Sequence, residues 1–459
     1  MADECQAERV TRWHLHLKTL EALLFGELNL QLLQLHRPTL DQRRTKADQT
    51  RTHFFLLFFN YLRIIRNWYA ICRQLQRTKN ERALQNRQPK NGESAMTINR
   101  RKFLGAALAS TTAGIAVAAP ALANAAASKE SFNLKMTNAY PPGSPFYVQG
   151  PGSPMDFCKK VGEMSGGRLN ISHFAAGELI PALEGFDAVS QGTVEMNAAN
   201  AYFWAGKIPA AQFFTTVPFG LNTQGMMAWL YQGGGLKLWH ELYEPYGLVA
   251  FPMGNTGVQM TGWFRDPIET VSDLEGLKMR IPGLAGKVYS ELGVTVRLLP
   301  GGEIFPALER GVIDAAEFVG PYQDRRLGLH KAAKNYYTTG WHEPTNVTEL
   351  LINKKVWDSM PKDLQMIIQM AAQASVLESL SWSEANNADA LTDLVQNEGV
   401  IAKPLPAPIV SRLKEVTADT LLTMANADAQ TKKVYDAYMA FKDKHASWAA
   451  LSEKPLLNM

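Results

Sequence analysis

From Phe132 onward, short β-like runs alternate with amphipathic helical runs, and this alternation restricts the fold more than any other feature of the sequence. The run FNLKMTN is followed by a helical stretch, Met155 to Glu163, and then by the β-like run RLNISHFAAG. Strands separated by helices are typical of an α/β fold with a mainly parallel sheet. We therefore predict that class for the part of the chain after Phe132.

Two segments of this part echo one another. GFDAVSQGTVEMNAANAYFW from Gly185 and IFPALERGVIDAAEFVGPY from Ile304 each contain a helical run, a glycine, a β-branched turn, an acidic residue, a strand and an aromatic-rich loop. The match is short and could arise by chance. It favours two similarly wound lobes.

A second lobe is expected to follow Gly247, where LVAFPMGNTGVQMTGW contains strand, loop and strand. From Pro361 the apolar positions recur at helical spacing for a long stretch, which predicts a long helix with an apolar face to bury. We expect this division of the chain: 126–250 as lobe I, 251–342 as lobe II, and 343–459 as a return to lobe I with long C-terminal helices.

The segment SDLEGLKMRIPG places an arginine at a strand end. Ser272 and Glu275 fit a capping box for one helical turn that Gly276 ends, and Arg280 then closes the strand LKMRI just before Pro282. In open α/β sheets, ligands bind at the carboxyl ends of strands. Arg280 therefore lies where a ligand is expected.

An export signal begins at Met96. The stretch MTINRRKFLGAALASTTAGIAVAAPALANAAA has paired arginines, Arg100 and Arg101, then an Ala-rich apolar core and small residues at the cleavage positions. The pattern is that of a twin-arginine signal over 96–125. Such a signal must lead its chain, so we expect Met96 to be the true start and 1–95 to be a misassigned upstream extension. A cytoplasmic helical module over 1–95 and a membrane anchor in place of a cleaved signal are the alternatives.

Charge argues against a nucleic-acid partner. The chain has 47 Lys and Arg against 43 Asp and Glu, but residues 1–95 alone hold 16 against 9, so the basic excess belongs to that segment. After removal of 1–125 the product is mildly acidic and lacks the basic patch that nucleic-acid binding needs.

Four polar residues at strand ends or in the following loops form a candidate site: Gln259, Arg280, Glu317 and Glu343. A guanidinium matches a carboxylate with two hydrogen bonds, which suits Arg280 to gripping an organic acid. Glu317 lies in the uncharged run AAEFVGP and needs a cation, an arginine or a proton as partner. With Gln259 and Glu343 it supplies oxygen ligands that suit sodium or calcium better than zinc. Each residue alone is equally compatible with an ordinary salt bridge or hydrogen bond.

Enzyme motifs are missing. The sequence has no GxSxG, HExxH, P-loop or GxGxxG at a strand–helix junction. We therefore expect a binding protein and no enzyme. A hydrolase or lyase acting on a small acid is the enzymatic alternative, and it would need a base and a nucleophile near Arg280.

The chain resembles the DctP-type extracytoplasmic solute receptors of tripartite ATP-independent periplasmic (TRAP) transporters. The resemblance is carried in order by SGGRLNISHFAAGEL, FDAVSQGTVEM, DLEGLKMRIPG, LPGGEIFPALERGVIDAAEFVGPY and NKKVWDSMPKDLQ, and it covers Phe132 to about Lys444. It implies a two-lobe periplasmic binding protein fold with a hinge and a long C-terminal helix. It also implies export to the periplasm, no catalysis, and the membrane subunits of the transporter as partners. A receptor that feeds a sensor is the alternative.

The segments GNTGVQMTGW, AAEFVGPY and WHEP are similar to the subgroup that binds 2-oxo or 2-hydroxy monocarboxylates with a bridging sodium or calcium ion. That resemblance implies Arg280 as the carboxylate grip and Tyr202 as a further contact to the acid. The implied metal ligands are Gln259, Glu317, Phe318 through its carbonyl, and Glu343. Because residue 318 is a phenylalanine, the resemblance does not decide between pyruvate-like and lactate-like acids as the ligand. The subgroup further implies a homodimer built from the long helix after Pro361.

Overall fold

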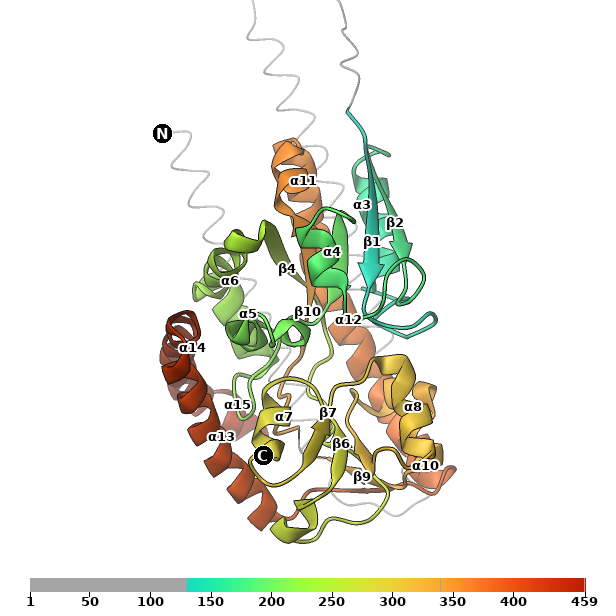
Figure 1. Ribbon diagram of the computed structural model, residues 1–459, viewed down its shortest axis with the longest axis vertical. Helices are drawn as coiled ribbons and strands as arrows, with labels where there is room; N and C mark the ends of the chain where they lie inside the picture. Colours follow the sequence, from blue (N-terminus) through green and yellow to red (C-terminus); the bar gives the residue numbers. More distant parts are fainter. Residues whose placement is uncertain (1–129, 339, 458) are drawn as a thin grey trace, which may run out of the picture. The chain divides into compact units, whose positions relative to one another are not determined.

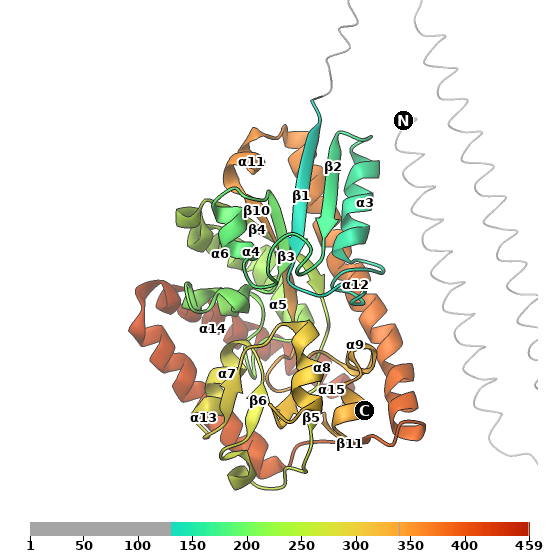
Figure 2. The same ribbon diagram turned by 45° about the vertical axis from the view of Figure 1, so that its right-hand side comes forward.

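The computed structural model describes residues 130–338, 340–457 and 459, all of which belong to one structural unit, Pro120–Met459. The expected extension and signal, 1–95 and 96–125, lie outside the described residues. Within the described part, the predicted α/β class is confirmed: two mixed sheets are surrounded by helices (Figures 1 and 2).

The first lobe is built on a five-stranded sheet of order β2-β1-β3-β10-β4. β1 pairs in parallel with β2 and β3, whereas β10 is antiparallel to both β3 and β4. Its strands are β1 (Phe132–Asn138), β2 (Leu169–Phe174), β3 (Met196–Ala199), β4 (Leu248–Asn255) and β10 (Val347–Asn353). The helices of this lobe are α3 (Pro154–Met164), α4 (Gly185–Ser190), α5 (Thr223–Gln232), α6 (Gly235–Tyr243) and α11 (Lys354–Ser359).

The second lobe is built on a six-stranded sheet of order β11-β9-β5-β8-β6-β7. β6 is parallel to both β7 and β8, so their carboxyl ends meet at one edge of the sheet. The strands are β5 (Gly262–Phe264), β6 (Lys278–Arg280), β7 (Thr295–Arg297), β8 (Ala315–Ala316), β9 (Asn335–Tyr337) and β11 (Ile401–Lys403). The helices are α7 (Gly283–Ser290), α8 (Gly301–Glu309), α9 (Pro321–Leu327) and α10 (Leu329–Ala332).

The chain passes between the sheets three times. It leaves the first sheet after β4 through 256–261, returns through 338–346 to β10, and reaches the second sheet again at β11. The first crossing therefore lies after Asn255, and the expected boundary at 250 falls inside β4. Both loops that join the lobes carry candidate site residues, Gln259 in the first and Glu343 in the second.

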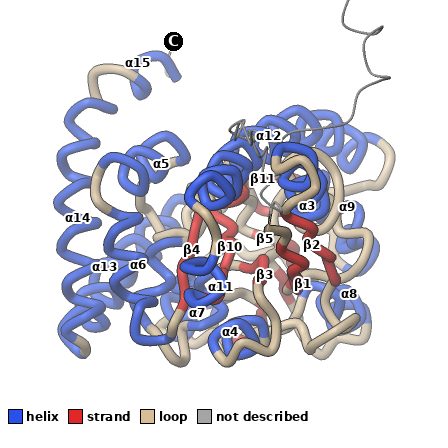
Figure 3. The backbone as a smooth tube through the Cα atoms, turned by 90° about the horizontal axis from the view of Figure 1, so that it is seen from above, coloured by secondary structure: helices blue, strands red, loops and turns tan. Residues whose placement is uncertain are grey.

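The long helix predicted after Pro361 is confirmed as α12 (Lys362–Gln396), which has 35 residues. It packs on β4 and α3 in the first lobe and on α9 in the second, so one rigid element spans both lobes (Figure 2). After β11, α13 (Ala407–Ala427) and α14 (Ala429–Ala449) form an antiparallel pair that is followed by α15 (Glu453–Leu457) (Figure 3). α13 packs against α7 and α14 against α5 and α6, so this pair also contacts both lobes.

Each lobe has its own apolar core. In the first, Met136, Phe157 and Leu350 are buried between the sheet and its helices. In the second, Met279 and Val288 are buried with residues of α13, including Ile409. Burial of a side chain of this size contributes about 1.5–3 kcal/mol. No helix among the described residues is long and apolar enough to cross a membrane.

The capping box before β6 differs from the predicted one. Thr270 and Asp273, not Ser272 and Glu275, exchange the two capping hydrogen bonds, and they begin a short 3-10 helix over Val271–Leu274. Both pairs have the same spacing, and Asp273 Oδ2, which accepts the capping hydrogen bond from the Thr270 N–H, also accepts one from the Glu269 N–H. The additional hydrogen bond from the Glu269 N–H favours the Thr270–Asp273 pair. Gly276 still turns the chain into β6 with a φ of 76°.

Candidate functional site

Arg280 lies at the carboxyl end of β6 and is only 2% exposed. Its Nη1 donates to the Glu317 carbonyl at 2.5 Å and to Glu317 Oε2 at 3.1 Å, and its Nε donates to the Leu299 carbonyl at 3.3 Å. Nη2 makes no hydrogen bond with any described residue. The guanidinium is thus fixed on one side and retains donors on the other.

Glu317 follows β8 directly and is fully buried. Its N–H donates to the Arg280 carbonyl at 3.0 Å, which sets the two residues side by side at the ends of adjacent strands. Burial raises the pKa of the Glu317 carboxyl to about 8, although the charge of Arg280 acts in the opposite direction. Its Oε1 is buried and has no hydrogen-bond donor in the described part of the chain.

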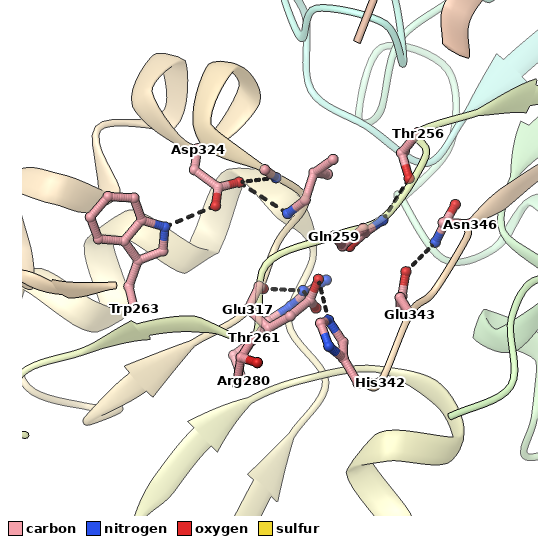
Figure 4. Close-up of polar contacts among 12 residues, drawn as sticks. Thr256, Gln259, Thr261, Trp263, Arg280, Glu317, Asp324, His342, Glu343 and Asn346 are labelled. Atoms are coloured by element: carbon pink, nitrogen blue, oxygen red, sulfur yellow. Dashed lines mark hydrogen bonds and ion pairs between the residues drawn. The ribbon is translucent and has the colours of Figure 1, made fainter. Parts of the chain in front are cut away.

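Gln259 lies in the loop after β4, is 1% exposed, and is held by two hydrogen bonds. Its main-chain N–H donates to the Glu343 carbonyl at 3.1 Å, and its Nε2 donates to Thr256 Oγ1 at 3.2 Å. These contacts leave its Oε1 buried and without a donor from the described residues. Figure 4 shows Gln259 above Glu317 and Arg280, and Glu343 to their right on a separate segment.

Glu343 belongs to a second group of contacts that reaches into the first lobe. Asn346 Nδ2 donates to Glu343 Oε2 at 2.6 Å and lies 3.5 Å from the hydroxyl of Tyr202. Asn200 Nδ2 donates to Asn346 Oδ1 at 2.7 Å. Burial, followed by the nearby Glu317 charge, raises the pKa of Glu343 to about 8. The structure therefore joins Tyr202 and Glu343 through Asn346, a residue that the sequence reasoning did not select.

His342 is the second residue that sequence reasoning missed. Its Nε2 lies 3.6 Å from Glu317 Oε1, and neither ring nitrogen has a hydrogen-bond partner among the described residues (Figure 4). Burial lowers its pKa to about 4, so the ring is neutral at pH 7. The motif WHEP, from which Glu343 was selected, contains this histidine. A single histidine carries no spacing signal, and only the fold brings it to Glu317.

Aromatic rings form one wall of the site. The Phe318 ring lies 6.0 Å from Arg280 Cζ, 6.3 Å from the Tyr140 ring and 5.9 Å from the Tyr147 ring. Tyr140 and Tyr147 stack with centroids 3.7 Å apart, and the Tyr140 hydroxyl donates to Asn200 Oδ1. The two tyrosines come from the loop after β1, far from Phe318 in sequence.

A buried carboxylate outside this group fixes the loop that follows Glu317. Asp324 Oδ1 accepts hydrogen bonds from the Val319 and Gly320 N–H groups, and Oδ2 accepts one from Trp263 Nε1 (Figure 4). Oδ2 also accepts a hydrogen bond from the Tyr336 hydroxyl. All of these donors act on one carboxylate, which holds the chain around Phe318 in place. Asp324 is thus a positioning residue.

The chemistry of the donor set suits a hard cation. Gln259 Oε1 and Glu317 Oε1 are buried oxygens that lack donors, and an unpaired buried acceptor is costly unless a cation or another group satisfies it. Amide and carboxylate oxygens are the ligands that calcium and similar cations prefer. The described residues contain no cluster of three or more His, Cys, Asp or Glu side chains able to hold a metal ion. A site here therefore needs amide or main-chain oxygens as well.

Comparison with known proteins identifies the family. Residues 147–428 match the model of the DctP family, the bacterial extracellular solute-binding proteins of family 7. The chain belongs to the DctP family. It is therefore a TRAP-type solute receptor, and the family consists of solute-binding proteins and not of enzymes. The resemblance inferred from the sequence motifs is confirmed.

Three proteins are similar to this DctP receptor over most of their own length. A monocarboxylate 2-oxoacid-binding periplasmic protein of Nostoc sp. PCC 7120 is 47% identical over 296 residues, which cover 64% of this chain and 81% of that protein. A TRAP periplasmic solute-binding protein of Pseudoalteromonas atlantica with bound sodium and pyruvate is 38% identical, with a TM-score of 0.69 over 72% of this chain and 99% of that one. A TRAP transporter solute-binding protein of Bordetella bronchiseptica, a dimer with calcium and picolinate in one of its sites, is 35% identical, with a TM-score of 0.69 over 72% and 97%.

Proposed function

We propose that this receptor binds a short 2-oxo or 2-hydroxy monocarboxylate together with a bridging sodium or calcium ion. One observation carries the proposal: the buried oxygens Gln259 Oε1 and Glu317 Oε1 lack donors next to a buried arginine whose Nη2 is free of hydrogen bonds to described residues. A cation satisfies the oxygens, and an acid satisfies the arginine.

The cation would be held by the side-chain oxygens of Gln259 and Glu317 and by the carbonyl of Phe318, with Glu343 as a further oxygen ligand. Its charge would offset that of Glu317, so that an anionic acid can bind nearby without net repulsion. Glu317 is already paired with Arg280 through Oε2, so Oε1 is the oxygen left for the ion.

Arg280 would bind the carboxylate of the acid through its free donor, and Tyr202 would contact the acid from the first lobe. Tyr202 is buried and lies against Gly283, where an added Cβ would meet its ring at 3.2 Å. This contact reaches across from one lobe to the other. The acid would therefore contact both lobes, as expected of a receptor that closes on its ligand.

The similar proteins support this ligand class. The Nostoc relative is named for 2-oxoacid binding, and the Pseudoalteromonas structure contains sodium and pyruvate. A thermal-shift screen of the purified protein tests the proposal, with pyruvate, 2-oxobutyrate, lactate and succinate each added with and without sodium or calcium. We expect stabilisation by the monocarboxylates and not by succinate. Stabilisation by succinate alone would contradict the proposal.

We further propose export by the twin-arginine route, with the signal beginning at Met96. The support is the signal pattern around Arg100 and Arg101. Mass spectrometry of the mature protein and replacement of both arginines by lysine test it. A mature N-terminus near Ala125 and loss of export in the double variant are expected. Export that is insensitive to this replacement contradicts the route.

A homodimer built on α12 is the last part of the proposal. Met366, Met370 and Leu377 are 53%, 41% and 65% exposed and lie at helical spacing on this helix. The Bordetella relative is a dimer. Light scattering should give twice the monomer mass for the wild type and the monomer mass for Met370→Glu with Leu377→Glu. A monomeric wild type contradicts the dimer.

A further inference from the structure

A cavity lies beside the segment 340–344, which contains His342 and Glu343. Its volume is about 500 Å³, which is within the range of small-molecule sites. Its walls come from the loop before α5, the loop before β10, α13 and α14: Pro218, Phe219, Gly220, Gly340, Trp341, Pro344, Lys414, Thr417, Ala418, Leu421, Tyr435, Met439 and Lys442. We call it the α13–α14 pocket. None of its lining residues belongs to the candidate acid site.

The charged residues that line the α13–α14 pocket are all positive. Lys414 and Lys442 are its charged residues, and no Asp or Glu lines it. Neither lysine forms an ion pair with any described residue, whereas many exposed lysines of this chain do. Lys442 is partly buried, and this burial is the main reason that its pKa is lowered. The charge of Asp443 raises the pKa of Lys442, and the charge of Lys414 lowers it. Two adjacent unpaired ammonium groups favour an anion.

Apart from Thr417, the remaining side chains that line the pocket are apolar or aromatic. Trp341 is buried, and its ring lies 5.5 Å from that of Phe219, whose N–H donates to the Trp341 carbonyl at 2.7 Å. Phe219 has a φ of 53°, a conformation that is uncommon for a residue other than glycine and is often retained at functional positions. Tyr435 and Met439 face the same cavity from α14. The walls thus suit a flat or branched apolar body.

We propose that the α13–α14 pocket binds a small organic anion that has an aromatic or branched apolar body and a carboxylate. The carboxylate lies between Lys414 and Lys442, and the apolar body packs against Trp341 and Phe219. This ligand differs from the acid proposed above, because it needs no metal ion and no arginine. The two sites share only the loop 340–344.

Calorimetric titration of the full chain with naphthalene-2-carboxylate tests this proposal, in the presence of saturating pyruvate and sodium so that the acid site is blocked. We expect saturable binding of the naphthoate. Lys414→Gln with Lys442→Gln should weaken it about tenfold or more, since each lost ion contact removes a charge-assisted interaction. Lys444 is an exposed lysine of α14 that does not line the pocket, and Lys444→Gln should leave the affinity for naphthoate unchanged.

Three results would overturn the proposal: equal affinity for the neutral analogue naphthalene-2-methanol, unchanged affinity in the double lysine variant, or equal competition by inorganic phosphate, which has no apolar body. The Arg280→Lys variant separates the two sites. It should bind naphthoate as the wild type does, and loss of naphthoate binding in that variant would assign the probe to the acid site. If the proposed acid function fails, pyruvate does not block the acid site, and the comparison of Arg280→Lys with the wild type then assigns the naphthoate to one site or the other.

Discussion

The two carboxylate oxygens of Glu317 have different partners: Oε2 accepts a hydrogen bond from Arg280 Nη1 at 3.1 Å, whereas Oε1 is buried without a donor among the described residues. A fully buried ion pair is stable only when its remaining lone pairs are satisfied. The unsatisfied oxygen is next to the neutral ring of His342 and below Gln259 (Figure 4). This asymmetry is the basis of the proposed cation site.

Replacing Arg280 by lysine should weaken pyruvate binding about 100-fold. Lysine keeps the charge but loses the planar pair of donors that holds Glu317 and a carboxylate at the same time. Calorimetry at constant sodium measures the change. Arg297→Lys on the neighbouring strand β7 is the matched control, because Arg297 pairs in register with Arg280 yet is exposed. A near-normal affinity in Arg280→Lys would refute the assigned role.

Replacing Glu317 by glutamine should abolish the dependence of acid binding on the cation. The amide keeps the shape of the side chain but lacks the charge that attracts the ion, and it leaves Arg280 buried without its counter-ion. Above pH 8, where Glu317 of the folded protein carries its charge, we therefore also expect a stability loss of about 3–5 kcal/mol. Glu349→Gln is the control, because Glu349 is a buried carboxyl in the first lobe that accepts hydrogen bonds from Trp204 and Tyr243, outside the candidate site. Retention of cation-dependent binding in Glu317→Gln would argue against this ligand.

Stability should decrease as pH rises from about 5 to about 8. Burial raises the pKa of Glu349 to about 8 from an ordinary value of 4.5. Between these values the folded protein keeps a proton that the unfolded chain releases, so the free energy of unfolding is largest at low pH and falls as pH rises. Urea unfolding measures the free energy of unfolding at pH 5.5 and at pH 8. The decrease between these two pH values should be smaller for Glu349→Gln than for the wild type, by at least about 1 kcal/mol. Equal differences in both proteins would contradict the predicted titration.

Gly340→Ala should displace the loop that holds Gln259. An added Cβ at residue 340 would lie 2.4 Å from the Gln259 carbonyl oxygen, a main-chain atom that can move only with its loop. We expect a stability loss of about 1–3 kcal/mol and weaker acid binding. Gly206→Ala is the control, since an added Cβ there meets nothing within 4 Å and Gly206 has no left-handed backbone conformation. Wild-type behaviour of Gly340→Ala would show that this contact is not needed.

Local sequence patterns predict site residues that lie at the ends of strands. They do not predict site residues that the fold brings to the site from other parts of the chain. The sequence pattern singles out Arg280, which ends strand β6, and Glu317, which follows strand β8, and parallel pairing of β6 with β8 then sets them side by side. Asn346 and His342 carry no such signal. Each becomes part of the site only because β10 returns the chain from one lobe to the other.

The aromatic wall and the capping box illustrate the same limit. Tyr140 and Tyr147 lie in the loop after β1, and they reach Phe318 only when the first lobe faces the second. The choice between two capping pairs of equal spacing depended on which carboxylate could also accept the N–H group of Glu269. Sequence spacing alone does not contain that information.

The most direct test of the central claim is a calorimetric titration of metal-stripped receptor with pyruvate in a choline buffer, repeated after addition of sodium and of calcium. We predict weak or undetectable binding without either ion and restored binding with at least one of them, because Gln259 and Glu317 then hold the cation that binds the acid. Pyruvate binding of equal affinity in all three conditions would contradict it.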